Sequence, residues 1–127
     1  MTTELKRIVH VDDDEDILEI ARMALQLVDS FDLHQFSSAA AALKDIDDIA
    51  PDLLLLDVMM PDMTGPELWD ELRRRRQDHA PPAVFMTAKA EERLAVELRE
   101  RGALDVVTKP FDPMTLGARI RDAWATA

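Results

Sequence analysis

The sequence predicts an α/β fold in which a parallel sheet of five strands is covered by helices on both faces. Short apolar runs alternate with longer amphipathic runs five times along the 127 residues. Strands that alternate with helices in this way indicate right-handed β-α-β units with parallel strands. One run, Leu53–Leu56, consists of consecutive leucines, which is typical of a strand buried on both faces. Because no linker, repeat or low-complexity segment interrupts the pattern, we expect residues 1–127 to form one domain.

The first elements are a strand, an acidic turn, a long helix and a second strand. Arg7–Val11 is rich in β-branched residues and predicts the first strand. The acidic stretch Asp12–Asp16 follows it, and its residues 14–16 suit the positive end of a helix dipole. Asp32–Phe36 alternates apolar and polar residues and predicts a weaker strand. Between these two strands, the apolar residues follow the spacing of a helix, which predicts a long helix there: Ile17, Ile20, Ala21, Ala24, Leu25 and Val28.

Two helices flank the leucine strand in the middle of the chain. Ser37 or Ser38 can cap an alanine-rich helix that runs to about Asp48. After the leucine strand, Pro61–Gly65 has the composition of a loop. Pro66 suits the first position of the next helix, because a helix leaves the first backbone N–H without a partner anyway.

The last part of the chain supplies two strands and two helices. In chain order we expect a strand at Ala83–Met86, a helix at Ala90–Arg101 ended by Gly102, a strand at Leu104–Val107 and a helix at Pro113–Trp124. The basic run Arg73–Arg76 closes the preceding helix and suits the negative end of its dipole. We therefore assign this run no contact with nucleic acid.

Composition and charge exclude several classes of protein. With 47% hydrophobic and 32% charged residues, the chain is expected to be globular. No apolar run approaches the roughly 20 residues that span a bilayer, and the chain has neither a secretory leader nor cysteine, so we expect a cytoplasmic protein without membrane contact. The formal charge is −11, from 15 basic and 26 acidic residues. Such a chain is repelled by nucleic acid, and we expect its partners to be cations and cationic protein surfaces.

Side chains suited to metal and phosphate chemistry stand at the ends of four predicted strands. Asp12 and Asp13 end the first strand and Asp57 the third, while Thr87 and Lys109 end the last two. Because open parallel sheets bind ligands outside the carboxyl ends of their strands, we expect these five residues to converge. Clustered carboxylates repel one another unless a cation relieves them, and an all-oxygen set suits Mg²⁺. A carboxylate there can attack phosphorus, while the ammonium and hydroxyl groups stabilise the phosphoryl oxygens.

Four segments in register resemble the receiver domain of two-component response regulators. They are VDDDED at 11–16, LLLLDVMMPDMTG at 53–65, FMTA at 85–88 and VTKPF at 107–111. Each segment alone is a weak indication, but their order, spacing and flanking apolar strands match over essentially the whole chain. The resemblance implies a flavodoxin-like receiver fold with strand order 2-1-3-4-5. It also implies a cis peptide bond between Lys109 and Pro110.

The same resemblance implies a function in phosphorelay signalling. Asp57 would accept a phosphoryl group from the phosphohistidine of a sensor histidine kinase or a histidine phosphotransfer protein, and this would switch a surface that binds a downstream protein. Thr87 would move to bind the phosphoryl group, and Lys109 would pair with it. The chain would catalyse only its own phosphorylation and dephosphorylation and would not be an enzyme in the usual sense. The implied ligands of Mg²⁺ are Asp12, Asp13, Asp57 and the backbone carbonyl of Met59.

The sequence departs from the family three residues before Lys109, where an aromatic side chain usually swings inward on phosphorylation. Val106 stands there, and the chain has no tyrosine. A β-branched side chain is stiff about χ1, so we expect phosphorylation to be read through the loop after Thr87 and the helix that follows. Met59 and Lys89 stand where family residues flank the attacking water, and they predict slow loss of the phosphoryl group.

Other classes of protein share parts of this pattern. A haloacid-dehalogenase-like phosphatase also uses Asp, Thr, Lys and Mg²⁺, and Asp12-x-Asp14 resembles its first motif. Its nucleophile, however, stands on the first strand and a later acidic pair completes its metal site, whereas after Lys109 this chain has only Asp112 and Asp122, neither at a strand end. A calcium loop built on Asp12, Asp14 and Asp16 fails, because its sixth position is Ile17 instead of glycine and its twelfth is Met23 instead of glutamate. A receiver segment of a larger regulator, with an output domain outside this sequence, stays open.

Overall fold

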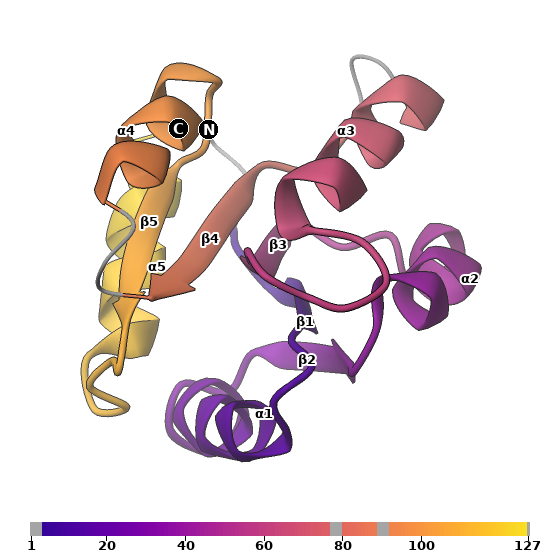
Figure 1. The fold of residues 1–127 in the computed structure, drawn as a ribbon. Coiled ribbons are helices and arrows are strands. Elements are labelled where there is room, and N and C mark those ends of the chain that lie inside the picture. The colour runs from indigo at the N-terminus through magenta and orange to yellow at the C-terminus, as the bar shows by residue number, and fades with distance from the viewer. Residues whose placement is uncertain (1–3, 77–79, 89–91, 127) are drawn as a thin grey trace.

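A five-stranded parallel sheet forms the centre of the computed structural model, which describes residues 4–76, 80–88 and 92–126 (Figure 1). The strands are β1 (Arg7–Val11), β2 (Asp32–Phe36), β3 (Leu53–Asp57), β4 (Ala83–Ala88) and β5 (Asp105–Lys109). Their order across the sheet is β2-β1-β3-β4-β5, and every neighbouring pair is parallel. The predicted fold class and strand order are confirmed, as is the cis peptide bond between Lys109 and Pro110.

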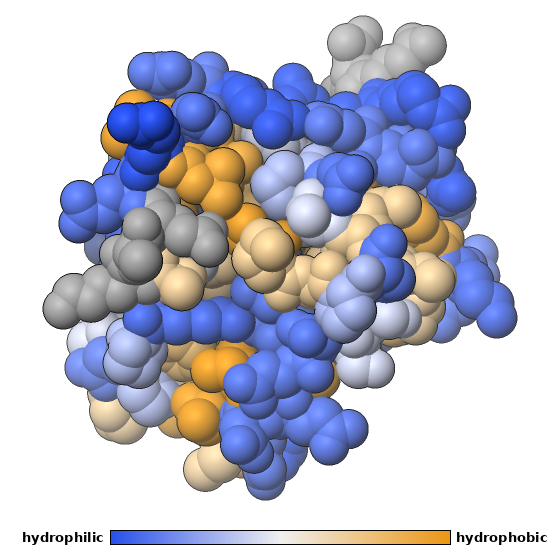
Figure 2. Space-filling model, viewed as in Figure 1, coloured by the Kyte–Doolittle hydropathy of each residue, from blue (hydrophilic) through white to orange (hydrophobic). Residues whose placement is uncertain are grey.

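Helices cover both faces of the sheet (Figure 1). They are α1 (Glu15–Arg22), which continues into a π-helix η1 (Met23–Val28), α2 (Ala39–Ile49), α3 (Gly65–Arg76), α4 (Glu92–Glu100) and α5 (Leu116–Ala125). One buried cluster joins α2, α3 and α4 to the sheet, and a second joins α1, η1 and α5 to the opposite face. Among the described residues, none of these helices is both long enough and apolar enough to cross a bilayer. The face seen in Figure 2 is mostly hydrophilic, with apolar side chains gathered across its middle.

The central strand β3 shows how the two clusters fix the site. Leu54 and Leu56 pack into the cluster of α2, α3 and α4, whereas Leu53 and Leu55 pack into the other cluster. All of these leucines are fully buried, and each such side chain stabilises a fold by about 1.5–3 kcal/mol. Because β3 is held on both faces, the position of its last residue, Asp57, is fixed by the core.

The last two strands extend further than the apolar runs predict. β4 continues to Ala88 and β5 to Lys109, where their pairing still matches Thr87 with Thr108 and Ala88 with Lys109. Hydrogen bonding between the strands therefore continues beyond the end of the apolar sequence. As a result, Thr87 and Lys109 are held by the sheet itself rather than by the loops that follow.

The first predicted helix is only partly a regular α-helix. Its second half, Met23–Val28, is a π-helix, in which each turn holds more residues and the side chains shift around the axis. Ala21, Ala24 and Leu25 are buried, but Ile20 and Val28 are 39% and 57% exposed. The helical spacing of these apolar residues assumed one uniform helix, and Val28 lies where the π-helix changes that spacing.

Local hydrogen bonds set where the middle helices begin. Ser38, rather than Ser37, caps α2 by accepting a hydrogen bond from the Ala41 N–H at 3.1 Å. Thr64 and Glu67 form a capping box, in which each backbone N–H donates to the other side chain. This box starts α3 one residue before the predicted position. The start of α5 also differs, at residue 116 instead of 113. The predicted start of α4, Ala90, lies outside the described residues.

Candidate functional site

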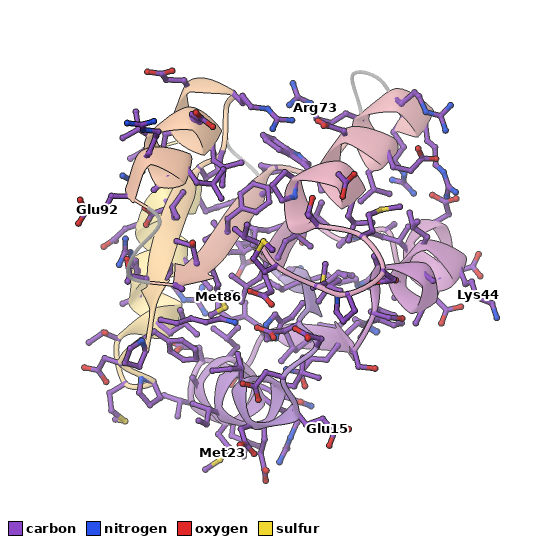
Figure 3. The ribbon with its side chains drawn as sticks, in the orientation of Figure 1. Glu15, Met23, Lys44, Arg73, Met86 and Glu92 are labelled. Atoms are coloured by element: carbon purple, nitrogen blue, oxygen red, sulfur yellow. The ribbon has the colours of Figure 1, made fainter. Side chains whose placement is uncertain are left out.

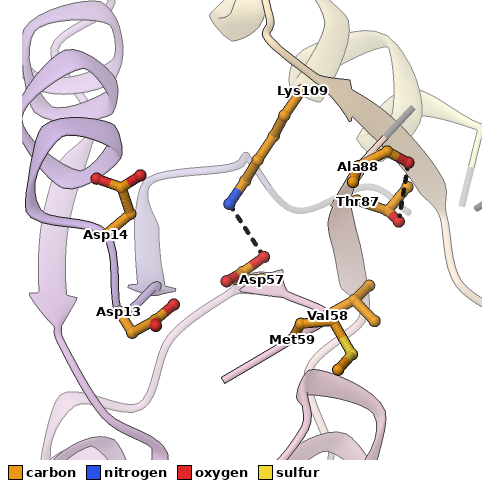
Figure 4. A pocket seen from close by; sticks show the side chains of 8 residues that line it. All are labelled: Asp13, Asp14, Asp57, Val58, Met59, Thr87, Ala88 and Lys109. Atoms are coloured by element: carbon orange, nitrogen blue, oxygen red, sulfur yellow. Dashed lines mark hydrogen bonds and ion pairs between the residues drawn. The ribbon is translucent and has the colours of Figure 1, made fainter. Parts of the chain in front are cut away.

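A cavity of about 280 Å³ opens at the carboxyl ends of the central strands (Figure 4). Its lining comes from the β1–α1 loop and from the ends of β3, β4 and β5: Asp13, Asp14, Asp57, Val58, Met59, Thr87, Ala88 and Lys109. Four of the five strand-end residues that the sequence singles out therefore line one cavity. The fifth, Asp12, is fully buried and reaches the same group of side chains through Lys109. The predicted convergence is confirmed.

Three carboxylates form the acidic side of this cavity. Asp12, Asp13 and Asp57 each offer an oxygen, and these oxygens all lie within 4.8 Å of one another. Asp12 and Asp57 are buried, whereas Asp13 is exposed. A backbone hydrogen bond from the Asp14 N–H to Oδ1 of Asp12, 2.9 Å long, fixes the turn that follows β1. Three oxygen ligands on one side of an open cavity fit Mg²⁺, which retains several waters and accepts phosphate oxygens.

Lys109 supplies the positive charge of the site. Its Nζ donates to Oδ2 of Asp12 at 2.9 Å and to Oδ1 of Asp57 at 3.0 Å. Burial by itself lowers the pKa of Lys109, but the hydrogen bonds to the two carboxylates outweigh it and raise that pKa above its ordinary value. Lys109 therefore remains an ammonium ion that holds two of the three acids in place; Figure 4 shows its bond to Asp57.

Asp57 has the most perturbed carboxyl group of the cavity. Burial raises its pKa from 3.8 to about 6, and the charge of Asp12 adds to this effect, while the hydrogen bond from Lys109 opposes it. At pH 7 the group is therefore mostly ionised but poorly solvated. A carboxylate in that state, exposed to an open cavity, can act as a nucleophile toward phosphorus.

The remaining predicted residues differ in how they relate to the cavity. Thr87 lines it, is 4% exposed and donates to its neighbour's carbonyl, that of Ala88, at 3.4 Å. Met59 also lines it, with a side chain that is 62% exposed; the role of its carbonyl as a metal ligand stays a prediction. Lys89 lies outside the described residues. Val106 is 3% exposed and packs in the buried cluster of α2, α3 and α4. It does not line the cavity.

Two residues contribute to the site in ways that the sequence did not reveal. Asp14 was predicted only as a helix-dipole charge; it caps α1 by accepting hydrogen bonds from the backbone of Asp16 and Ile17, but it also lines the cavity. Gly65 packs against the backbone of Asp57, and a Cβ atom there would lie 2.3 Å from the Asp57 carbonyl oxygen. A glycine at the start of a helix, between Thr64 and a proline, was the available indication of such close packing.

The fold and the site together define a class of protein. A buried aspartate, flanked by two further acids and a lysine at the carboxyl edge of a 2-1-3-4-5 sheet, is the arrangement of a receiver domain. The model of the response regulator receiver domain family matches residues 8–121. The chain therefore belongs to this family, whose members are signalling domains rather than enzymes in the usual sense.

Individual relatives support the same assignment. The DNA-binding response regulator MtrA of Mycolicibacterium smegmatis is 39% identical over 95% of this chain and 51% of its own length. The alkaline phosphatase synthesis transcriptional regulatory protein PhoP of Bacillus subtilis is 37% identical over 91% of this chain and 47% of its own length. The CheY-like receiver domain protein of Methanospirillum hungatei superposes with a TM-score of 0.81, at 28% identity, over 97% of this chain and 96% of that one. The chain thus spans about half the length of the curated relatives it matches.

Proposed function

We propose that this chain is the phosphoacceptor in a two-component phosphorelay and that Asp57 receives the phosphoryl group. The observation that carries the proposal is the setting of Asp57, a buried carboxylate at the base of an open cavity. It accepts a hydrogen bond from Lys109, and one of its oxygens lies within 4.8 Å of an oxygen of each of two further acids. Family membership supports the donor class, the phosphohistidine of a sensor histidine kinase or a histidine phosphotransfer protein. Residues 1–127 would act as one receiver domain, in the cytoplasm.

The side chains of the cavity suit the transfer step. A carboxylate oxygen of Asp57 attacks phosphorus, and the phosphorus–nitrogen bond of the phosphohistidine breaks. The electron pair of that bond stays with the imidazole, which takes up a proton from solvent. Lys109 then pairs with a phosphoryl oxygen in place of its present bond to Asp57, and the hydroxyl of Thr87 reorients to donate to another. Both residues stabilise charge and transfer no proton, as loose phosphoryl-transfer transition states require.

The acidic residues suit a divalent cation. Asp12, Asp13 and Asp57 would hold Mg²⁺ together with the backbone carbonyl of Met59. The ion would neutralise negative charge on the phosphoryl oxygens, which three carboxylates alone would repel. Lys109 cannot do this alone, since its single charge is already shared between two acids.

The phosphorylated chain would act on another protein. Val106 is buried in the core and has no ring to reorient, so the signal would be read through the segment after Thr87 and through α4. A second candidate is a receiver that controls an output domain in the same polypeptide. The observation favouring it is that the chain spans about half of its DNA-binding relative MtrA; determination of the complete reading frame tests it.

Intact-mass measurement after incubation with acetyl phosphate tests the acceptor. With Mg²⁺, the wild-type chain should gain the mass of one phosphoryl group, and chelation of the metal should prevent the gain. Asp57→Asn should gain nothing, whereas Asp122→Asn, an exposed position on α5, should be modified like the wild type. Equal labelling of Asp57→Asn would show that another residue is the acceptor.

A further inference from the structure

A second hollow, of about 330 Å³, lies at the opposite edge of the sheet from the acidic cavity. It forms where the chain enters β4 and β5, beside the end of α3. The lining residues that matter here are Trp69, Arg73, Pro81, Pro82, Arg101 and Gly102. Figure 3 shows Arg73 near the end of α3, on the side toward α4. No step of the phosphoryl transfer uses these residues.

Arg73 differs from the other three arginines that end α3. Arg74 and Arg75 pair with Glu71, and Arg76 pairs with an aspartate of α2. Arg73 forms no ion pair within the part of the chain that the structure describes. Its guanidinium instead lies over the ring of Trp69, 4.4 Å from the ring centroid. Stabilisation of the helix end accounts for positive charge in this turn, but it does not account for a guanidinium held over a ring beside a hollow.

The indole under Arg73 is fixed by the core. Trp69 is 4% exposed, and its ring meets Phe85 edge-on with centroids 5.4 Å apart. Arg73 also donates to the Arg101 carbonyl at 3.4 Å. A guanidinium stacked on a rigid ring keeps its planar set of N–H donors in one orientation, which lowers the entropic cost of binding a planar anion.

The charge of the hollow suits a single carboxylate. Arg101 is paired with Asp70, so the positive charge of Arg73 is the one left to be balanced in this lining. The surrounding chain carries a formal charge of −11, which disfavours a dianion such as phosphate more than a monoanion. Pro81 and Pro82 offer apolar rings without N–H groups, suited to the carbon chain of an extended ligand. We propose that this hollow binds an extended segment of a partner protein, in which one side-chain carboxylate forms a bidentate pair with Arg73.

Titration with a peptide, followed by NMR, tests the proposal. The probe is acetyl-Leu-Glu-Leu-amide, and the matched probe carries glutamine in place of glutamate. The indole N–H of Trp69 should shift with the acidic probe, while that of Trp124, on α5, serves as the internal reference. Arg73→Gln should weaken binding at least about ten-fold, the loss expected for a charge-assisted bidentate pair. Arg74→Gln, which removes a guanidinium paired with Glu71, should change binding less than about two-fold.

Several outcomes would overturn the proposal. Equal shifts with the glutamine probe, or unchanged binding by Arg73→Gln that still melts like the wild type, would show that no carboxylate is recognised. Arg73→Lys keeps the positive charge but cannot form two parallel hydrogen bonds, so it should bind more weakly than the wild type. Equal binding by this variant would contradict the bidentate pair. A stronger response to inorganic phosphate than to the peptide would show that the hollow selects phosphate. The titration should give the same result in the Asp57→Asn background, so its failure is distinct from failure of the phosphoacceptor proposal.

Discussion

Asp57 is the residue at which burial and charge conflict most directly. Burial raises its pKa from 3.8 to about 6, so the folded chain binds this proton more tightly than the unfolded chain does. The stabilising contribution of the group is therefore full below pH 3.8 and is lost as the pH rises through about 6. Above that range the fold contains an ionised, poorly solvated carboxylate, which the hydrogen bond from Lys109 partly compensates.

Replacement of Asp57 by asparagine should consequently stabilise the fold in a pH-dependent way. Without Mg²⁺, the free energy of unfolding of Asp57→Asn should exceed that of the wild type by on the order of 1–2 kcal/mol more at pH 8 than at pH 4. The full shift would give more, but Asp57 borders an open cavity, where water screens part of the charge. Urea denaturation at both pH values measures the difference, and Asp122→Asn is the control. A gain of the same size at both pH values would contradict the raised pKa.

At the scale of single residues, the sequence predicted which side chains meet but not how deeply they lie. The strand ends placed Asp57 and Lys109 together because a parallel sheet brings its carboxyl ends to one edge. Asp12 and Asp13 are neighbours in sequence, yet the first is fully buried and the second exposed. His10 is likewise fully buried, with a pKa lowered to about 3 mainly by burial. Such depths depend on the packing of α1 and α5, which periodicity does not specify.

Among the elements, the connection from β3 to α3 has the closest contact with Asp57, because Gly65 packs directly against its backbone. The Gly65 N–H donates to the Val58 carbonyl at 2.9 Å, and a Cβ on Gly65 would lie 2.3 Å from the Asp57 carbonyl oxygen and 3.3 Å from the ring of Phe85. Both neighbours are held by the core, so neither can easily move away. Any side chain at position 65 therefore has to displace the end of β3 or the start of α3.

Gly65→Ala should therefore destabilise the fold by about 2–4 kcal/mol and lower the rate of phosphorylation by acetyl phosphate. Gly102→Ala provides the comparison, because its φ of 106° is strained for alanine while its Cβ would meet Trp69 only at an ordinary 4.0 Å. That variant should lose about 1 kcal/mol and keep its phosphorylation rate. Urea denaturation and intact-mass kinetics measure both effects. A Gly65→Ala chain with wild-type stability and rate would show that the connection tolerates a side chain.

The limits of each element were less predictable than its existence. Apolar spacing located every strand and helix, but β4 and β5 continue because their backbones still pair, which side-chain polarity does not reveal. Nor did apolar spacing indicate the π-helix after Arg22.

Hydrogen bonds between elements were also beyond the sequence patterns. Gln35, on β2, donates to the Leu18 carbonyl of α1 at 2.6 Å and contacts Nδ1 of His10 at 3.1 Å. Tertiary hydrogen bonds of this kind involve residues far apart in the chain, so no local pattern contains them.

For the molecule as a whole, the two edges of the sheet differ in how far the sequence predicted them. At the carboxyl edge, one rule of parallel sheets collects the acidic residues whatever the order of the strands. The order itself followed from the resemblance to receivers, because periodicity does not say which strands are neighbours. The hollow at the other edge combines Trp69 and Arg73 with residues 80–82 and 101–102. Taken one at a time in the sequence, these residues give no sign of a shared site, so only the folded arrangement shows that they meet.

The overall charge and the local acidic group predict different responses to Mg²⁺. The formal charge of −11 means that any added salt reduces repulsion across the molecule, whereas a site at Asp12, Asp13 and Asp57 would bind the ion only in the folded chain. At ten times its dissociation constant, such a ligand adds about 1.4 kcal/mol, which should raise Tm by about 4–7 °C. Asp13→Asn should lose most of this rise, because it removes the exposed ligand while leaving both hydrogen bonds of Lys109 intact. Differential scanning calorimetry in MgCl₂ and in KCl of equal ionic strength separates the two effects. Equal Tm values in the two salts would mean that Mg²⁺ acts only by screening the charge of the whole molecule, and an undiminished rise in Asp13→Asn would mean that the ion binds without this residue.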